Sequence, residues 1–337
     1  MLKKALLAIF GIALLAGVNA QEKEEFKPHG KMEVRIYSNF NADVVGDGDD
    51  KAFQLKRSYF GYKYNITPEF RAHVRVDLAG NEYLSGDEND GKEMQYVFFK
   101  TAALYYEKTN WFAAFGLQDT YQFKEQESLW GKRYILPSLL DRQKFISSAD
   151  IGASAKYHTD QFVVDVAVFN GEGYKNLQQD NDFRASLGVT GFFADKKIIA
   201  RAYVDQSTDE VQLGSVTGFI GLDLDKFTLG AEYTTQKNYR YKEGHDRNAY
   251  SFFTQYNFTH RIGLWARLDG MSSDFSNVDQ EYIDNQLKVD GEDIFAGVEF
   301  KVVPKKINTS LNYQHHISDE ADPVNSGKIF INLEVRF

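Results

Sequence analysis

The chain has no cysteine among its 337 residues, which excludes disulfide scaffolds, CxxC redox motifs and metal sites built on thiolates. Proline is scarce, with 5 residues, and the one long apolar run ends too early for a membrane-spanning helix. By contrast, the chain has 27 Phe and 20 Tyr although its mean hydropathy is only −0.46. A polar average with many aromatic residues is typical of a transmembrane β-barrel, whose apolar residues alternate with polar ones. On composition alone a soluble β-sandwich stays open.

The first segment is typical of a secretory signal peptide. Lys3 and Lys4 precede an apolar stretch over residues 5–18, and small side chains flank a cleavage position after Ala20. The formal net charge of −9 argues against nucleic acid as a partner. The predicted divisions of the chain are a signal peptide at 1–20, a short periplasmic segment at 21–29 and an outer-membrane β-barrel at 30–337.

Apolar and polar residues alternate with a period of two along most of the remaining chain, as in strands that bury one face. In residues 70–78, for example, Val74 and Val76 alternate with Arg75. Each run spans about 10 residues, the length that a tilted strand needs to cross an outer-membrane apolar band. Three segments are less regular: 94–106, 111–118 and 53–64. The last changes parity near Arg57, which indicates either a β-bulge or a mistaken register.

The connections between these runs alternate between short turns and long polar loops. Links such as 108–110 and 159–161 are short, whereas 80–93 and 119–148 are long. Outer-membrane barrels have this asymmetry, because their periplasmic turns are short and their extracellular loops are longer. The pattern predicts an all-β fold: a transmembrane antiparallel up-and-down β-barrel of about 16 strands with both termini on the short-turn side.

Several segments resemble known outer-membrane proteins. The terminal run Leu333–Phe337 resembles the C-terminal signature of bacterial outer-membrane proteins. Residues 53–70, FQLKRSYFGYKYNITPEF, are similar to the early hairpin of the phosphate-selective porin O and P family. Residues 169–173, followed by Asn181 and Arg184, resemble a later strand-loop-strand stretch of the same family. The similarity is diffuse and runs along most of the mature chain.

This resemblance implies a porin in the outer membrane of a Gram-negative bacterium, assembled as a homotrimer in contact with membrane lipid and lipopolysaccharide. It also implies that the barrel assembly machinery recognises Phe337. In the family the third loop folds into the lumen and forms the constriction, and here that loop would be 119–148. The residues that would form the constriction are Lys124, Lys132, Arg133, Arg142 and Lys144.

The alternation also predicts which charged residues face a water-filled lumen. Rows of Arg and Lys inside a low-dielectric wall attract anions, which favours an anion preference. The alternative is that these cations pair with lumenal acids such as Asp77 and Asp165. Phosphate itself stays a hypothesis, since the phosphate-binding residues of the resembled family have no position-by-position match here. The predicted inward cations are Arg35, Arg57, Lys63, Arg71 and Arg75 on neighbouring strands, with Arg184, Arg201, Arg261 and Arg267 further round.

The sequence contains no recognisable catalytic or metal site. It has no GxSxG, HExxH or GxxxxGK[ST] motif, so we expect no enzyme activity and no cofactor. A hydrolase assembled from distant strands stays open, because catalytic triads are recognised by geometry. The acidic segment 43–50 lacks the distal Glu of an EF-hand loop, which favours a solvated loop over a Ca²⁺ site. His315 and His316 are adjacent, so a strand points them to opposite faces and they cannot chelate together.

We interpret the chain as a passive diffusion channel for small hydrophilic solutes, with anions as the hypothetical preference. One alternative is a sugar-selective channel in which inward aromatic residues form a stacking track. Another alternative is a plugged barrel that acts through its extracellular loops. The residues of the proposed stacking track are Tyr37, Tyr59, Tyr203 and Trp265.

Overall fold

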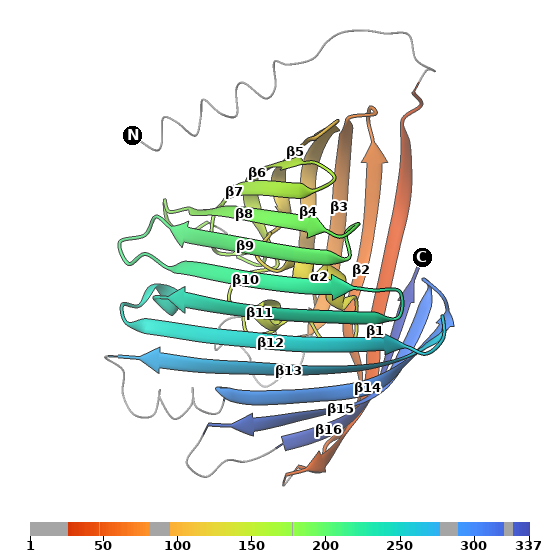
Figure 1. Cartoon of the computed structure of the whole chain (residues 1–337). Coiled ribbons are helices and arrows are strands. Elements are labelled where there is room, and N and C mark those ends of the chain that lie inside the picture. Colours follow the sequence, from red (N-terminus) through yellow and green to blue (C-terminus); the bar gives the residue numbers. More distant parts are fainter. Residues whose placement is uncertain (1–25, 47, 81–94, 177, 277–288, 320–325) are drawn as a thin grey trace.

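The computed structural model describes residues 26–46, 48–80, 95–176, 178–276, 289–319 and 326–337. In this part of the chain, 16 β-strands close into one barrel (Figure 1). The predicted signal peptide and residues 21–25 of the predicted periplasmic segment lie outside the described residues. Among the residues described, no helix is long and apolar enough to cross a membrane.

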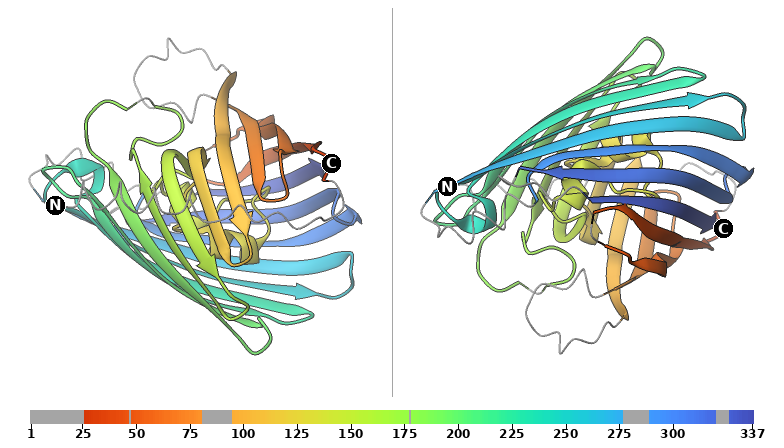
Figure 2. Two further views of the ribbon diagram at one scale, coloured as in Figure 1. Left: turned by 90° about the horizontal axis from the view of Figure 1, so that it is seen from above. Right: turned by 90° about the horizontal axis from the view of Figure 1, so that it is seen from below.

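Each strand pairs antiparallel with its neighbours in the sequence, and β16 pairs with β1 to close the barrel. At this seam the Phe337 backbone N–H donates to the Val34 carbonyl oxygen at 3.1 Å. Figure 2 shows β16, in dark blue, beside β1, in red, from both directions. The predicted antiparallel up-and-down barrel is confirmed. The strands are β1 (His29–Val45), β2 (Lys51–Asn65), β3 (Phe70–Gly80), β4 (Gln95–Lys108), β5 (Trp111–Asp119), β6 (Ala149–His158), β7 (Phe162–Phe169), β8 (Arg184–Phe193), β9 (Ile198–Ser207), β10 (Gly214–Asp223), β11 (Phe227–Lys237), β12 (His245–Asn257), β13 (Ile262–Phe275), β14 (Gly291–Val303), β15 (Ile307–Ser318) and β16 (Ser326–Arg336), with a 3₁₀ turn η2 (Tyr239–Tyr241).

The strands keep apolar side chains outside and polar side chains inside. On β9, Tyr203 and Asp205 are buried in the interior whereas Val204 between them is exposed on the outer surface. On β3, Val74 is exposed and Asp77 is completely buried. A continuous apolar outer belt around a polar interior is stable when hydrocarbon covers the belt. The fold is therefore that of an outer-membrane β-barrel, as predicted.

Two register shifts turn consecutive residues toward the lumen. The pairing of β1 with β2 skips Lys56, and the pairing of β3 with β4 skips Lys100. Each skipped residue is the extra residue of a β-bulge, so it points inward together with the residue that follows it. The bulge at Lys56 explains the parity change near Arg57. The bulge at Lys100 explains why the alternation of 94–106 was irregular.

The connection from β5 to β6, residues 120–148, lies inside the barrel, and we call it the lumen loop. It contains the short helices α2 (Lys124–Trp130) and α3 (Leu139–Arg142). Helix α2 packs on β10 and β11, and α3 packs on β12. Figure 1 shows α2 on the inner side of these strands. The expectation that the long third loop folds into the lumen is confirmed.

Candidate pore constriction

An apolar core joins the lumen loop to side chains of β1, β2, β10 and β12–β14. The Trp130 ring centroid lies 5.4 Å from that of Phe253 and 5.5 Å from that of Trp265. Gly131 ends α2 with a φ of 65°, a left-handed conformation that turns the chain back on itself. The Trp130 indole N–H then donates to the Leu136 carbonyl oxygen at 3.0 Å. The other buried members of this core are Tyr37, Tyr59, Tyr134, Ile135, Phe219 and Phe295.

Buried ion pairs hold the same loop to the wall at two further points. Lys132 Nζ lies 2.8 Å from Glu299 Oε2 on β14. The Arg142 guanidinium of α3 bridges Asp269 and Asp293, at 2.9 and 2.5 Å. Removing one partner of a buried ion pair typically costs about 3–5 kcal/mol, since the other charge is left uncompensated. These contacts make the lumen loop a fixed part of the interior.

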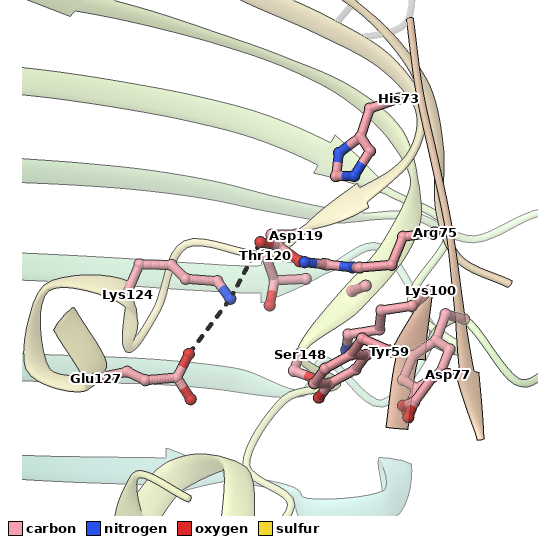
Figure 3. Close-up of polar contacts among 12 residues, drawn as sticks. Tyr59, His73, Arg75, Asp77, Lys100, Asp119, Thr120, Lys124, Glu127 and Ser148 are labelled. Atoms are coloured by element: carbon pink, nitrogen blue, oxygen red, sulfur yellow. Dashed lines mark hydrogen bonds and ion pairs between the residues drawn. The ribbon is translucent and has the colours of Figure 1, made fainter. Parts of the chain in front are cut away.

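The opposite face of the lumen loop carries charged side chains toward β3–β5 (Figure 3). Lys124 Nζ lies 3.4 Å from Asp119 Oδ2 and 3.7 Å from Glu127 Oε2. Arg75, from β3, reaches the same Asp119 at 3.2 Å. These side chains stay partly exposed, unlike the Lys132 pair on the other wall. The structure thus brings a predicted wall residue, Arg75, and a predicted loop residue, Lys124, together around one carboxylate.

A second group of charges surrounds Glu33 on the inner face of β1. Its carboxylate lies 2.8 Å from Lys63 Nζ, 2.9 Å from His73 Nε2 and 3.8 Å from Arg75 Nη1. Arg75 therefore links this group to Asp119 and the lumen loop. Two predicted cations, Lys63 and Arg75, share this single acid, so this sector of the wall carries an excess of positive charge.

Arg35 and Arg71 add to this excess. Arg71 lies over the Tyr105 ring, with its guanidinium carbon 5.2 Å from the centroid. Arg35 is exposed within β1 and is hydrogen-bonded to Tyr37. Neither has an ion pair within 4.0 Å in the part of the chain that the structure describes. Of the predicted stripe of Arg35, Arg57, Lys63, Arg71 and Arg75 on β1–β3, Arg57 pairs with Asp77 and the other four carry this excess.

The other predicted cations are each placed apart from this sector or bound to an acid of their own. Arg261 is exposed in the turn that precedes β13, and Lys144 is exposed near the end of the lumen loop. The remaining arginines pair with lumenal acids, as the alternative interpretation expects. These pairs are Arg57–Asp77 at 3.4 Å, Arg133–Asp141 at 2.6 Å, Arg184–Asp205 at 2.6 Å, Arg201–Asp165 at 2.7 Å and Arg267–Asp269 at 2.6 Å.

Asp141 of the lumen loop interacts with cations from both the loop and the wall. Burial alone would raise the pKa of Asp141, but Arg133, followed by Arg57 and Lys100, lowers this pKa below its ordinary value. The carboxylate is therefore ionised at neutral pH and balances the buried Arg133. A wall arginine, Arg57, and a loop arginine, Arg133, are brought together by this single acid.

Lys100 and Lys156 also point inward, and the sequence interpretation did not name them. Lys100 is buried, hydrogen-bonded to Ser148 and positioned 4.0 Å from the Tyr174 ring centroid. The bulge hid it, because it breaks the parity on which the prediction depends. Lys156 on β6 lies 3.8 Å from the Tyr121 ring centroid. Its alternation with the apolar residues of 151–157 already indicated an inward position, so the signal was present.

Carboxylates near the outer loops include Asp43 and a group of three aspartates. Asp43, near the end of β1, is bound to Lys328 at 2.9 Å. Asp180, Asp182 and Asp209 bring ligand oxygens within 4.8 Å of one another at the outer loops. Exposed acids of this kind are common in proteins without a bound metal ion.

Comparison with known proteins gives a likeness of fold. No family model matches the chain, and no curated protein matches its sequence. The outer membrane channel DcaP of Acinetobacter baumannii is similar in structure, with a TM-score of 0.65 and 13% identity over 95% of this chain and 100% of DcaP. Salmonella typhi OmpF in complex with daunomycin gives a TM-score of 0.66 and 12% identity over 91% of this chain and 97% of OmpF. The trimer form of OmpT, an outer membrane protein of Vibrio cholerae, gives a TM-score of 0.56 and 12% identity over 92% of this chain and 99% of OmpT.

Proposed function

We propose that the chain is a passive diffusion channel for small hydrophilic solutes in the bacterial outer membrane. The observation that carries the proposal is the lumen loop, anchored on β10–β14 and directing charged, partly exposed side chains toward β3–β5. A narrowed, charged and hydrated passage is how general porins limit solute size. The fold that the chain shares with an outer membrane channel supports this function. The diffuse resemblance to the phosphate-selective porin O and P family supports it too.

Liposome swelling with neutral sugars tests the proposal. We expect uptake rates that fall smoothly as sugar size increases, because a passive pore selects by size. Strong preference for one sugar over another of equal size would contradict it. Lipase and protease assays of the same preparation should show no activity, and activity in either would favour the hydrolase alternative.

We propose further that the channel prefers anions. The support is the sector on β1–β3, where Arg35, Lys63, Arg71 and Arg75 face few acids. Reversal potentials in a KCl gradient across a planar bilayer measure this preference. We expect chloride to be more permeant than potassium, and a cation-selective potential would contradict the proposal. Phosphate enters as one anion among several, since no position-specific phosphate site supports it.

The sugar-track alternative is opposed by the burial of its aromatic residues. Tyr37, Tyr59 and Trp265 belong to the core beneath the lumen loop, and Tyr203 packs with Tyr121 and Phe169 in a second core. A sugar stacks on an aromatic ring only where the face of that ring is open. A sugar-binding track on these rings would therefore require the lumen loop to move away from the barrel wall.

The plugged-barrel alternative has a specific observation in its favour. The apolar core around the lumen loop includes Tyr37 and Tyr59 of β1 and β2. It also includes four aromatic side chains of β10 and β12–β14: Phe219, Phe253, Trp265 and Phe295. A loop that spans the interior could close it. Single-channel recordings decide between the two functions, since a plugged barrel would show no conductance and a diffusion channel would show discrete steps.

The expected partners follow from the outer surface and from the resemblance. The exposed apolar belt supports contact with outer-membrane lipid and lipopolysaccharide. Phe337 is exposed at the end of the seam strand, where the assembly machinery could reach it. The trimer form of OmpT supports a homotrimer as the assembly to test. Analytical ultracentrifugation in detergent would report the oligomeric state, and a stable monomer would contradict the expectation.

A further inference from the structure

The short turn between β14 and β15 carries positive charge and no acid. Residues 301–306 read KVVPKK, in a chain whose formal net charge is −9. Lys305 and Lys306 are exposed, and neither lies within 4.0 Å of a carboxylate in the described part of the chain. Lys301 is turned elsewhere, because its Nζ donates to Asn257 Oδ1 at 3.4 Å. The end of this turn therefore carries uncompensated positive charge.

The seam strand adds a third cation beside this turn. Arg336 Nε donates to the Lys305 carbonyl oxygen at 2.7 Å, and the Arg336 backbone N–H donates to the Lys306 carbonyl oxygen at 2.8 Å. Figure 1 shows the C-terminus next to this turn. The C-terminal carboxylate of Phe337 compensates one of the three charges at most. We call Lys305, Lys306 and Arg336 the basic turn patch.

Apolar side chains of the outer belt border this patch. Phe300 and Val302, which precede the turn, are 40% and 53% exposed, and Phe337, which follows Arg336, is 65% exposed. The belt is the surface that hydrocarbon covers in this fold. Cations at the edge of such a belt lie at the level of the lipid headgroups. The patch and these three side chains thus form one surface with a charged end and an apolar end.

Another short turn at the same end of the barrel has a different arrangement. The turn between β8 and β9 also contains two lysines, Lys196 and Lys197. Acids accompany them, since Asp195 directly precedes Lys196 and Asp160 of the neighbouring turn lies 3.8 Å from Lys196 Nζ. The β14–β15 turn therefore differs from the β8–β9 turn in its lack of acids and not in its number of lysines.

We propose that the basic turn patch binds the phosphate of an anionic glycerophospholipid, such as phosphatidylglycerol, whose acyl chains lie along Phe300, Val302 and Phe337. A lipid of this class matches a surface that is charged at one end and apolar at the other. A free phosphate ion would leave the apolar end unused, and a zwitterionic lipid would bring an ammonium group beside three cations. Short turns of outer-membrane barrels are periplasmic, so the lipid belongs to the periplasmic leaflet.

The bound lipid would connect two elements that close the barrel. Its phosphate would contact both the β14–β15 turn and β16, and β16 pairs with β1 at the seam. The patch lies on the turns at the rim of the barrel, so its occupancy does not depend on whether the lumen conducts. The inference therefore goes beyond the proposed diffusion channel and can fail independently of it.

Native mass spectrometry of the chain in detergent, titrated with phosphatidylglycerol, tests the proposal. We expect saturable binding to the wild-type chain and about 30-fold weaker binding to Lys305→Gln/Lys306→Gln, because each lysine near a lipid phosphate contributes about 1 kcal/mol. Lys196→Gln/Lys197→Gln is the matched control, since it removes the same charge from a turn that contains acids, and it should bind as the wild type does. Equal affinities of the two double variants would overturn the proposal.

Two further titrations distinguish the sources of the phosphate. Phosphatidylcholine with the same acyl chains should bind the wild type no more tightly than it binds Lys305→Gln/Lys306→Gln, and inorganic phosphate should not displace phosphatidylglycerol. Displacement by inorganic phosphate, or a lysine-dependent affinity for phosphatidylcholine, would contradict the assignment to an anionic lipid. Lys305→Arg/Lys306→Arg keeps both charges and should retain the wild-type affinity, and a loss as large as that of the glutamine variant would contradict a contact based on charge.

Thermal unfolding in vesicles measures the same contact in a bilayer. We expect a higher melting temperature of the wild type in vesicles that contain phosphatidylglycerol than in phosphatidylcholine alone. This difference should shrink in Lys305→Gln/Lys306→Gln and persist in Lys196→Gln/Lys197→Gln. In phosphatidylcholine alone all three chains should unfold at the same temperature, which separates lipid binding from misfolding. An equal difference in all three chains would overturn the proposal.

Discussion

Arg201 and Arg71 both face the interior of the barrel, yet their surroundings differ. Arg201 donates to both oxygens of Asp165, at 2.7 and 3.0 Å, and to the Tyr121 carbonyl oxygen at 3.0 Å. Arg71 lies over the Tyr105 ring and has no ion pair in the described part of the chain. Buried pairs stabilise the fold, whereas partly exposed cations set the potential that a passing solute meets.

This contrast predicts opposite effects for the same substitution at the two positions. Arg201→Gln leaves the Asp165 carboxylate buried and uncompensated, and we expect a loss of about 3–5 kcal/mol in the free energy of unfolding. Arg71→Gln should leave that free energy nearly unchanged and reduce the chloride preference. Urea unfolding in lipid vesicles and reversal potentials measure the two effects. A strong stability loss in Arg71→Gln, with unaltered selectivity, would contradict the assignment of Arg71 to the solute path.

Lys175 gives the channel an expected pH dependence. It lies in the loop between β7 and β8, over the Phe98 ring at 5.1 Å, and burial, followed by Arg57, lowers its pKa to about 8. Lys175 is charged below this pKa and neutral above it. The chloride preference should therefore decrease as pH rises from about 7 to about 9. Lys175→Arg keeps the charge throughout this range and should flatten the profile, so an unchanged profile in that variant would exclude Lys175 as its source.

At the scale of the elements, the packing of α2 against β10 depends on a glycine. Gly221 on β10 has no side chain, and Leu129 of α2 fills the space where a Cβ atom would be. The same Cβ would lie 2.9 Å from Phe219 Cζ, a contact closer than packed carbons allow. Helix α2 can therefore pack on β10 because Leu129 and Phe219 both contact the Gly221 backbone directly.

Gly221→Val should displace α2 from the wall. Overpacking of this kind typically lowers the free energy of unfolding by about 1–3 kcal/mol. We expect the lumen loop to shift, because the strand is held in place by its neighbours in the barrel. We expect a larger and noisier single-channel conductance than in the wild type. Gly218→Val, on the same strand with nothing within 4 Å of its Cβ position, is the matched control and should leave conductance unchanged. Equal conductance in both variants would show that α2 does not depend on this contact.

The strands could be predicted from the sequence because alternation is a local property of each segment. The bulges could not be located from it, since one inserted residue such as Lys100 has the same local signature as an error in the register. The wall residues that the lumen loop contacts also could not be predicted from the sequence. Lys132 and Glu299 are 167 residues apart, and only closure of the barrel brings them together. The apolar residues within the loop, such as Trp130 and Leu139, were the available signal that it packs against something.

At the scale of the whole molecule, the outer face and the interior require different solvents. Val74 and Leu264 are exposed on the outer face, whereas Arg71 and Arg267 point inward from the same two strands. The same rungs of β3 and β13 thus separate hydrocarbon from a polar interior. This separation defines the barrel as a membrane wall rather than a soluble sandwich.

Spin labels test that separation, and the absence of cysteine allows each label to be placed singly. Labels at Val74 and Leu264 should be accessible to oxygen dissolved in lipid, and a label at Arg71 should be accessible to a water-soluble relaxation agent. The reverse pattern would contradict the orientation of the wall. A label on the exposed Lys237 outside the belt provides the aqueous control.

The most direct test of the whole account is single-channel conductance of the wild-type chain beside a chain in which residues 124–142 are replaced by a short Gly-Ser linker. The lumen loop is proposed to narrow an open barrel, so both chains should show discrete conductance steps, with larger steps when the loop is removed. A silent wild type that conducts only after the replacement would mean that the loop is a plug. Equal steps in the two chains would mean that the loop does not form the constriction.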